Sequence, residues 1–327
     1  MGMNWFITGG CGFLGTNLVK YLMHEGGHCI RVLDNLSVGS ELDLANVCSI
    51  QRLKGPKSDF SENHVQLIVG DILNPDSYQD YLIGADVVVH LAANTGVGPS
   101  VENPMADCLS NVVGTLRVLE AVRFTMCKRF VFASSGAPVG ECTPPIHEEM
   151  PAHPVSPYGA SKLAGEGYCS AYFKTYSIDT VALRFSNVYG PLSHKKSSVV
   201  ASFIQRALAG EEIEIFGNGC QTRDFIYVDD LIRAIYQSAT VIGVGGEIFQ
   251  IATNEETTVN KVAHLVKNIM EEKLGRKIQF KMNPPRLGDV LRNFSDISKA
   301  KARLNWEPSV SLSDGISKTL NWYTGKD

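Results

Sequence analysis

The sequence of 327 residues lacks long apolar runs, an excess of basic residues and a recognisable targeting segment. No stretch approaches the roughly 18 consecutive apolar residues of a membrane-spanning helix, so we expect no membrane partner. Lysine and arginine total 30 against 34 acidic residues and form no phosphate-tracking run, which argues against nucleic acid as a partner. The N-terminus has no charged region followed by an apolar run and a cleavage site, the pattern of a signal peptide.

Paired cysteines, internal repeats and Gly/Ser linkers are also missing. The eight cysteines stand singly, without a C-x-x-C pair or a zinc-like spacing, so we expect neither a metal site nor disulfides. They are Cys11, Cys29, Cys48, Cys108, Cys127, Cys142, Cys169 and Cys220. Reduced thiols of this kind are typical of a cytosolic protein, and we therefore predict a cytoplasmic location.

What is present is an alternation of short apolar runs with longer segments of helical period, which predicts βαβ units and a parallel sheet. With 44% hydrophobic residues the chain can bury a large core. We predict strands at Asn4–Thr8, Cys29–Asp34, Val65–Gly70, Val87–Leu91, Phe130–Ala133 and Thr180–Phe185, and helices at Leu14–Met23, Pro75–Leu82, Met105–Thr125 and Pro157–Thr175. The polar, weakly periodic stretch Leu36–Asn63 is predicted to be a surface excursion.

The alternation loosens beyond Arg184, which predicts a second, smaller lobe. Further helices are expected at Val199–Leu208, Val228–Ser238, Val259–Lys273 and Ser311–Thr324. The predicted fold is therefore α/β, a Rossmann-type doubly wound parallel sheet with a smaller C-terminal α/β substrate lobe. We place the first domain at residues 1–183, with a segment near 224–250 returning to it, and the second at 184–327.

A glycine-rich loop joins the first strand to the first helix. Gly9 permits a tight turn, Gly12 lets the backbone approach a pyrophosphate, and Gly15 lets the helix pack on the sheet. The anion would then bind at the helix N-terminus. The segment therefore predicts a dinucleotide site.

Two acidic residues at strand ends extend this site. Asp34 ends the second strand about twenty residues past the loop, where a carboxylate accepts hydrogen bonds from an adenosine ribose and repels a 2′-phosphate. This favours NAD over NADP, although Asp34 can also be read as a turn residue. Asp71 and Ile72 follow the third strand and are candidates for the adenine edge, although Gly-Asp is also common turn chemistry.

The catalytic candidates are Tyr158, Lys162 and Ser135. Tyr158 and Lys162 stand at i and i+4, one turn apart on one helical face. A fixed cation beside a phenol favours the phenolate, so we expect the pair to act as a base near neutral pH. Ser135 lies at the carboxyl edge of the sheet, where it can share the proton.

The motifs that carry a family resemblance follow one another in order along nearly the whole chain. They are Phe6–Gly15, Asp34, Gly70–Asp71, His90–Ala93, Asn111–Thr115, Ser134–Ser135, Ser156–Lys162, Leu183–Pro191, Arg223–Asp230 and Pro285–Asp289. Together they resemble the nucleotide-sugar epimerases and dehydratases of the extended short-chain dehydrogenase/reductase superfamily, and in particular the UDP-glucose and UDP-N-acetylglucosamine 4-epimerases.

The resemblance implies NAD as cofactor, a nucleotide sugar as substrate and a homodimer. It assigns the cofactor to Gly9, Gly12, Phe13, Leu14, Gly15, Asp34, Asn35, Asp71, Ile72, Leu91, Ala92, Ala93, Asn111, Tyr158 and Lys162. It assigns the substrate to Ser134, Ser135, Tyr158, Asn187, Arg223 and Arg286, with the two arginines neutralising phosphate. We expect the two long helices at Met105–Thr125 and Pro157–Thr175 to pack against their copies in the homodimer, because they are too apolar for a solvent-exposed surface.

The implied reaction is inversion at C4 of a UDP-hexose through a transient 4-keto sugar. Dehydratases of this fold carry an acidic pair after the strand-end hydroxyl, and Gly136–Ala137 stand there instead. A 4,6-dehydratase, a 2-epimerase, a decarboxylase and a non-catalytic NAD-sensing protein remain alternatives. Pro138–Val139 replace the common Val-Tyr of the family, and Asn293 falls near the position that closes the sugar pocket, so the sugar itself stays open.

Overall fold

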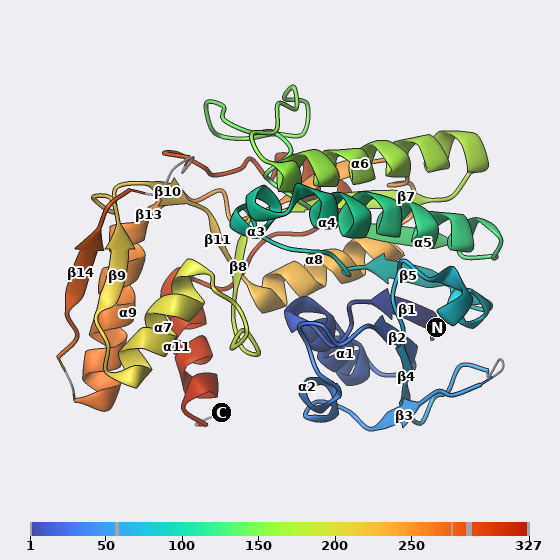
Figure 1. Cartoon of the computed structure of the whole chain (residues 1–327), viewed down its shortest axis with the longest axis horizontal. Helices are drawn as coiled ribbons and strands as arrows, with labels where there is room; N and C mark the ends of the chain where they lie inside the picture. The colour runs from blue at the N-terminus through green and yellow to red at the C-terminus, as the bar shows by residue number, and fades with distance from the viewer. Residues whose placement is uncertain (1, 56–58, 276, 286–289, 326–327) are drawn as a thin grey trace. The chain divides into compact units, whose positions relative to one another are not determined.

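The structure is a computed structural model that describes residues 2–55, 59–275, 277–285 and 290–325. The chain divides into two compact units (Figure 1). Unit 1 comprises Met1–Gly140, Pro151–Arg184 and Ala234–Phe249, and unit 2 comprises Glu141–Met150, Phe185–Arg233 and Gln250–Asp327. Each unit is therefore assembled from segments that are distant in the sequence.

Unit 1 is built around an eight-stranded sheet with the order β12-β7-β6-β5-β1-β2-β4-β3. The strands are β1 (Asn4–Thr8), β2 (Cys29–Asp34), β3 (Ile50–Arg52), β4 (Val65–Val69), β5 (Val87–His90), β6 (Arg129–Ser135), β7 (Thr180–Phe185) and β12 (Ile248–Ile251). The pairs β1–β2, β1–β5, β2–β4, β3–β4 and β5–β6 are all parallel. The predicted Rossmann-type parallel sheet is confirmed.

The central strands are buried because helices cover both faces of the sheet. In β1, Phe6 belongs to a hydrophobic cluster that includes Val118 and Cys169 of the helices α5 (Gly114–Arg123) and α6 (Pro157–Tyr176). The neighbouring Trp5 points to the other face, where its ring stacks on Tyr236 at a centroid distance of 5.8 Å. Apolar side chains on both faces explain why the central strands read as continuous apolar runs.

Further helices and helical turns complete unit 1. They are α1 (Phe13–Glu25), α2 (Glu41–Ala45), α3 (Val97–Glu102), α4 (Pro104–Cys108), the 3₁₀ turns η1 (Pro75–Ser77) and η2 (Gln79–Leu82), the π-helical turn η3 (Leu109–Val113), and the end of α8 (Val228–Thr240). Figure 1 shows α4, α5 and α6 on the same side of the sheet, away from α1.

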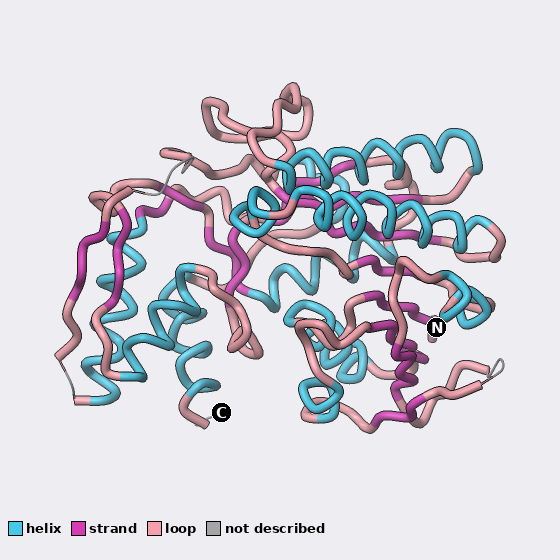
Figure 2. The backbone as a smooth tube through the Cα atoms, viewed as in Figure 1, coloured by secondary structure: helices cyan, strands magenta, loops and turns pink. Residues whose placement is uncertain are grey.

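Unit 2 contains three two-stranded sheets, counted over its described residues. They pair β8 (Asn187–Tyr189) with β11 (Phe225–Tyr227), β9 (Ile213–Phe216) with β14 (Phe280–Asn283), and β10 (Thr222–Arg223) with β13 (Thr257–Thr258). Figure 2 shows the parallel β9–β14 pair beside helical segments. The helices are α7 (Val199–Ala209), α9 (Val259–Leu274), α10 (Ser298–Leu304) and α11 (Leu312–Tyr323).

Several predicted elements differ from the structure. The predicted helix Met105–Thr125 is divided into α4, η3 and α5, and Pro75–Leu82 forms 3₁₀ turns instead of an α-helix. The excursion Leu36–Asn63 contains α2 and the edge strand β3, which pairs with β4. These short elements lack the length over which hydrophobic periodicity is informative. Among the described helices, none is long and apolar enough to cross a membrane.

Candidate active site

The carboxyl edge of the sheet brings the two halves of the predicted cofactor site together. β1 is flanked by β2 on one side and β5 on the other, so the strand order reverses there, and such a point forms a crevice in open α/β sheets. Gly9, at the end of β1, has a φ of 71°, and a Cβ at this position would lie 2.7 Å from the backbone nitrogen of Ala92. The loops after β1 and β5 are therefore in direct contact.

The glycine loop leaves the N-terminus of α1 open. The N-cap is Gly12, which makes no side-chain capping bond, and the first turn carries no acidic residue. In contrast, α6, α9 and α11 are each capped by a hydroxyl from Ser156, Thr258 and Ser311. An uncapped helix N-terminus with a glycine approach suits a pyrophosphate. Phe13 and Leu14, the first residues of α1, are half-buried beside it.

The end of β2 holds the predicted ribose-binding residues in a compact turn. Asp34 accepts hydrogen bonds from the backbone nitrogens of Cys11 at 2.9 Å and Leu36 at 2.8 Å. Its carboxylate is thereby fixed against the glycine loop. Asn35 donates to Asp71 at 2.9 Å, so the ends of β2 and β4 are joined. Ile72 packs its side chain into the core cluster, and its predicted adenine contact stays a prediction.

Asn111 lies in the π-helical turn between α4 and α5. Its amide oxygen accepts from the backbone nitrogen of Asn94 at 2.8 Å, and its amide nitrogen donates to the Asn94 carbonyl at 2.9 Å. These two hydrogen bonds fix the loop that contains Asn94. The loop follows Leu91, Ala92 and Ala93, all of which are half-buried. Asn111 itself is buried, so the structure gives it a positioning geometry.

The three catalytic candidates meet at the N-terminal end of α6. Lys162 Nζ lies 5.8 Å from the centre of the Tyr158 ring and donates to the Ala133 carbonyl at 2.9 Å. Ser135, the last residue of β6, hydrogen-bonds the Tyr158 side chain. The Tyr158 backbone nitrogen also donates to Ser100 of α3 at 3.1 Å, which fixes the first turn of α6.

Burial controls the protonation of this pair. It raises the pKa of Tyr158 to about 12, with the Asp107 carboxylate adding to the rise and the Ser135 hydrogen bond opposing it. It lowers the pKa of Lys162 to about 8, against the Asp107 and Glu166 carboxylates, which raise it. The sequence predicted a lowered phenol pKa, and that direction is wrong here because burial, the largest influence on Tyr158, raises it.

His90 bridges two elements behind the site. Its ring nitrogens contact the hydroxyls of Thr8 at 2.7 Å and Thr115 at 3.0 Å. Burial lowers the pKa of His90 to about 3, and the Lys162 charge contributes further. The imidazole is therefore neutral near pH 7 and acts as a satisfied core group.

Ser134 has a partner other than the predicted substrate. Its hydroxyl donates to Glu166 at 2.5 Å, and Glu166 forms two hydrogen bonds of 2.8 Å with Arg184. All three side chains are buried. The structure therefore gives Ser134 an internal contact, and its role toward substrate stays a prediction.

Unit 2 contains two further predicted substrate residues, Asn187 and Arg223. Asn187 begins β8 and is exposed, and its side chain donates to the Asp224 carbonyl at 3.2 Å. Arg223 donates to the carbonyls of Thr222 at 2.7 Å and Val290 at 2.6 Å. Arg286 lies outside the described residues.

Sequence reasoning missed the buried Asp224, which lies between Arg223 and β11. Its carboxylate accepts from Thr253 at 2.7 Å and 2.8 Å and from Asn254 at 3.0 Å. Burial raises the pKa of Asp224, although these hydrogen bonds lower it. Asp224 thereby ties the segment after β12 to the strand that carries Arg223.

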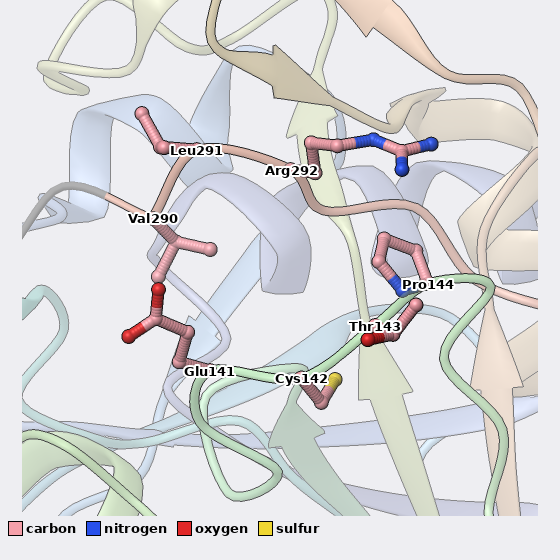
Figure 3. Close-up of a pocket in the computed structure, with 7 residues that line it drawn as sticks. All are labelled: Glu141, Cys142, Thr143, Pro144, Val290, Leu291 and Arg292. Atoms are coloured by element: carbon pink, nitrogen blue, oxygen red, sulfur yellow. The ribbon is translucent and has the colours of Figure 1, made fainter.

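A shallow pocket in unit 2 is shown in Figure 3. Its volume is about 180 Å³, below the roughly 300–1,000 Å³ of sites that enclose a small-molecule ligand. It is lined by Glu141, Cys142, Thr143, Pro144, Val290, Leu291 and Arg292. The Arg292 side chain is held by two hydrogen bonds to Glu256, of 2.7 Å and 2.8 Å. The pocket is thus too small to hold a nucleotide sugar alone.

Comparison with known proteins agrees with this architecture. Residues 5–252 match the model of the NAD dependent epimerase/dehydratase family. A UDP-glucose 4-epimerase of Mycolicibacterium smegmatis is 34% identical over 99% of both chains, and a UDP-glucuronate 4-epimerase of Thermodesulfobacterium geofontis is 33% identical over 97% of this chain and 95% of its own.

Among solved structures, the UDP-glucose 4-epimerase of Thermotoga maritima with UDP-glucose is 34% identical, covers 99% of both chains and has a TM-score of 0.87. The matched region contains the glycine loop, the Tyr158–Lys162 pair and the strand-end hydroxyls. With the fold, the glycine loop and the match in agreement, the chain belongs to the NAD-dependent epimerase/dehydratase family.

Proposed function

We propose that this protein is a UDP-sugar 4-epimerase in which unit 1 binds NAD and unit 2 binds the nucleotide part of the substrate. The observation that carries the proposal is the convergence of Ser135, Tyr158 and Lys162 at the carboxyl edge of the sheet. The similar proteins named above, which act on UDP-glucose or UDP-glucuronate, support the choice of a UDP-sugar.

The residues of unit 1 fit NAD. The open N-terminus of α1 suits the pyrophosphate, and Asp34 suits the adenosine ribose. When bound, NAD supplies a hydride acceptor and donor for the sugar carbon. We assign the cofactor to Gly9, Gly12, Phe13, Leu14, Gly15, Asp34, Asn35, Asp71, Ile72, Leu91, Ala92, Ala93, Asn111, Tyr158 and Lys162.

The protein's own contribution is proton transfer at the phenol oxygen of Tyr158. This oxygen takes the proton of the C4 hydroxyl as the keto sugar forms and returns it after the sugar has turned over. Ser135 hydrogen-bonds the phenol and can share the proton. We propose that the Lys162 ammonium stabilises the phenolate when it forms.

Epimerisation is favoured over dehydration by the residues that follow Ser135. Elimination of water needs an acid beside the reacting carbon, and Gly136 and Ala137 offer no ionisable group. A 4,6-dehydratase, and after it a 2-epimerase or a decarboxylase, remain the second choice. Asn187, Arg223 and Arg286 are proposed to bind the diphosphate, which guanidinium groups recognise through paired hydrogen bonds.

We also propose that the protein is a cytoplasmic homodimer. All eight cysteines are free, as in a reducing compartment. Val101, Met105 and Leu109 expose large apolar side chains on α3, α4 and η3. Exposed large apolar side chains on consecutive helical segments support a protein interface there.

The test is product analysis with a panel of substrates. The purified protein is incubated with UDP-glucose, UDP-N-acetylglucosamine, UDP-glucuronate and dTDP-glucose, and the products are separated by chromatography. We expect a C4 epimer from at least one UDP-sugar, and an unchanged rate in Tyr176→Phe, which alters a partly exposed tyrosine on the same helix. A 4-keto-6-deoxy product from dTDP-glucose, without any epimer, would establish the dehydratase instead.

A further inference from the structure

Asp107 is a buried carboxylate for which the sequence analysis gave no role. It lies in α4 and is 3% exposed. One oxygen accepts a hydrogen bond from the Asn111 side chain at 2.8 Å. The other oxygen is buried without a hydrogen-bond partner among the described residues. Because an unpaired buried carboxylate oxygen is costly, it calls for a physical explanation.

The bond to Asp107 fixes the orientation of the Asn111 amide. A carboxylate only accepts, so the amide nitrogen must face Asp107 and the amide oxygen must face the Asn94 nitrogen. The same amide nitrogen lies 3.2 Å from the Ser161 hydroxyl, which donates to the Tyr158 carbonyl at 3.0 Å. A continuous chain of polar contacts therefore runs from Asp107 to the backbone of Tyr158.

Asp107 also acts on the charge of Lys162. The ionisable groups around Lys162 are Asp107 on α4, Glu166 and Tyr158 on α6, and His90 on β5. Glu166 is paired with Arg184 through two hydrogen bonds, and His90 is neutral near pH 7. Over the described residues Asp107 forms no ion pair, and its carboxylate raises the pKa of Lys162.

We propose that Asp107 is a positioning residue of the proton-transfer site, which orients Asn111 and keeps Lys162 in its ammonium form. The proposal rests on the proposed function for its catalytic consequence. The effect of Asp107 on the charge of Lys162 can be measured without any substrate.

Removing the charge of Asp107 should shift the pKa values of its neighbours in a known direction. The Asp107 carboxylate raises the pKa of both Lys162 and Tyr158. Asp107→Asn keeps the shape of the side chain and an oxygen that accepts from Asn111, but the pKa values of Lys162 and Tyr158 should both fall. If Tyr158 must lose a proton and Lys162 must keep one, both limbs of the pH-rate profile then move to lower pH. A purely structural role would lower the rate or the Tm without moving the limbs.

The direct test is NMR titration of lysine labelled with ¹³C at Cε, from pH 6 to 10. The Lys162 signal is identified by its loss in Lys162→Met, and its pKa near 8 separates it from exposed lysines. We expect Asp107→Asn to lower this pKa by about one unit. The matched control is Glu102→Gln, which removes a charge from an exposed position at the end of α3 and should leave the pKa unchanged.

An unchanged Lys162 titration in Asp107→Asn would overturn the proposal whatever the enzyme does. If Asp107→Asn does not fold, Asp107→Ser provides a smaller hydroxyl that still accepts from Asn111. The second measurement is the pH dependence of kcat and kcat/KM on the epimerised sugar, with both limbs displaced to lower pH. If the wild type acts on no UDP-sugar, the proposed function fails, and the lysine titration still decides the role of Asp107.

Discussion

Burial acts in opposite directions on the two ionisable side chains of the proton-transfer pair. It favours the neutral phenol of Tyr158 and the neutral amine of Lys162, because it penalises either charge. Nearby charges and hydrogen bonds therefore decide the protonation states of the two side chains. The two carboxylates Asp107 and Glu166 support the ammonium, and the Ser135 hydrogen bond supports the phenolate.

Tyr158→Phe tests the acceptor of the proton. The change removes one oxygen and leaves the ring in place, so folding and NAD binding should persist while turnover falls by about 100-fold or more. Steady-state kinetics on the identified UDP-sugar, with NAD content measured in parallel, checks this. Near-native turnover would show that another group carries the proton.

Lys162→Met should act differently from Tyr158→Phe, because it removes the charge that we propose stabilises the phenolate. We expect both the rate and the retention of NAD to fall. The residual activity should rise toward alkaline pH, because without the ammonium the phenol needs a higher pH to ionise. Rates and bound NAD are measured from pH 6 to 10, and a flat residual profile would contradict this account.

Asp34 determines the choice of dinucleotide in our assignment. Its carboxylate is held at the end of β2 by the Cys11 and Leu36 nitrogens, so a 2′-phosphate would face a fixed negative charge. We expect the wild-type protein to bind NAD at least about tenfold more tightly than NADP. Asp34→Asn should reduce this difference in affinity between the two dinucleotides. Titration calorimetry measures both affinities, and equal wild-type affinities would disprove the assignment.

At the scale of elements, His90 joins β1, β5 and α5 through Thr8 and Thr115. Its pKa is lowered from 6.5 to about 3, so the unfolded state binds more protons between these values. The contribution of His90 to stability is complete above pH 6.5 and is lost as the pH falls toward 3.

His90→Gln removes this titration and keeps polar atoms between the two threonines. Wild type should lose about 2 kcal/mol more unfolding free energy than His90→Gln between pH 7 and pH 5. Urea denaturation at both pH values measures the difference. His64→Gln, at an exposed histidine, is the control and should follow the wild type.

At the scale of the whole molecule, the exposed apolar side chains of α4 and η3 predict the dimer contact. Met105 is 67% exposed and Leu109 46% exposed in the single chain. The double change of both residues to Glu should convert a homodimer into a monomer, because two charges would have to be buried in the interface. Sedimentation velocity at micromolar concentration provides the measurement.

The control is Ile242→Glu, at another exposed apolar residue, which should leave the dimer intact. A wild type that sediments as a monomer would refute the homodimer, and a dimeric double variant would place the contact elsewhere.

The sequence by itself determined the features that depend on local order. The bounds of β1, β2 and β7 follow from apolar runs, and α6 begins at Pro157 as predicted. The spacing within Gly9–Gly15 and between Tyr158 and Lys162 is equally local. These patterns lie within one turn or one strand, so they can be read without knowing which segments meet.

Only the tertiary structure decided the features that depend on contacts between distant segments. The split of the helix at Asn111, the internal bonding of Ser134 to Glu166, and the burial that reverses the expected pKa of Tyr158 all arise where separate elements pack together. Asp107 belongs to this group, because the contacts that continue from its partner Asn111 to Ser161 and the Tyr158 backbone join two distant segments of the chain. Desolvation is a property of the packed core, and the linear sequence carries no direct measure of it.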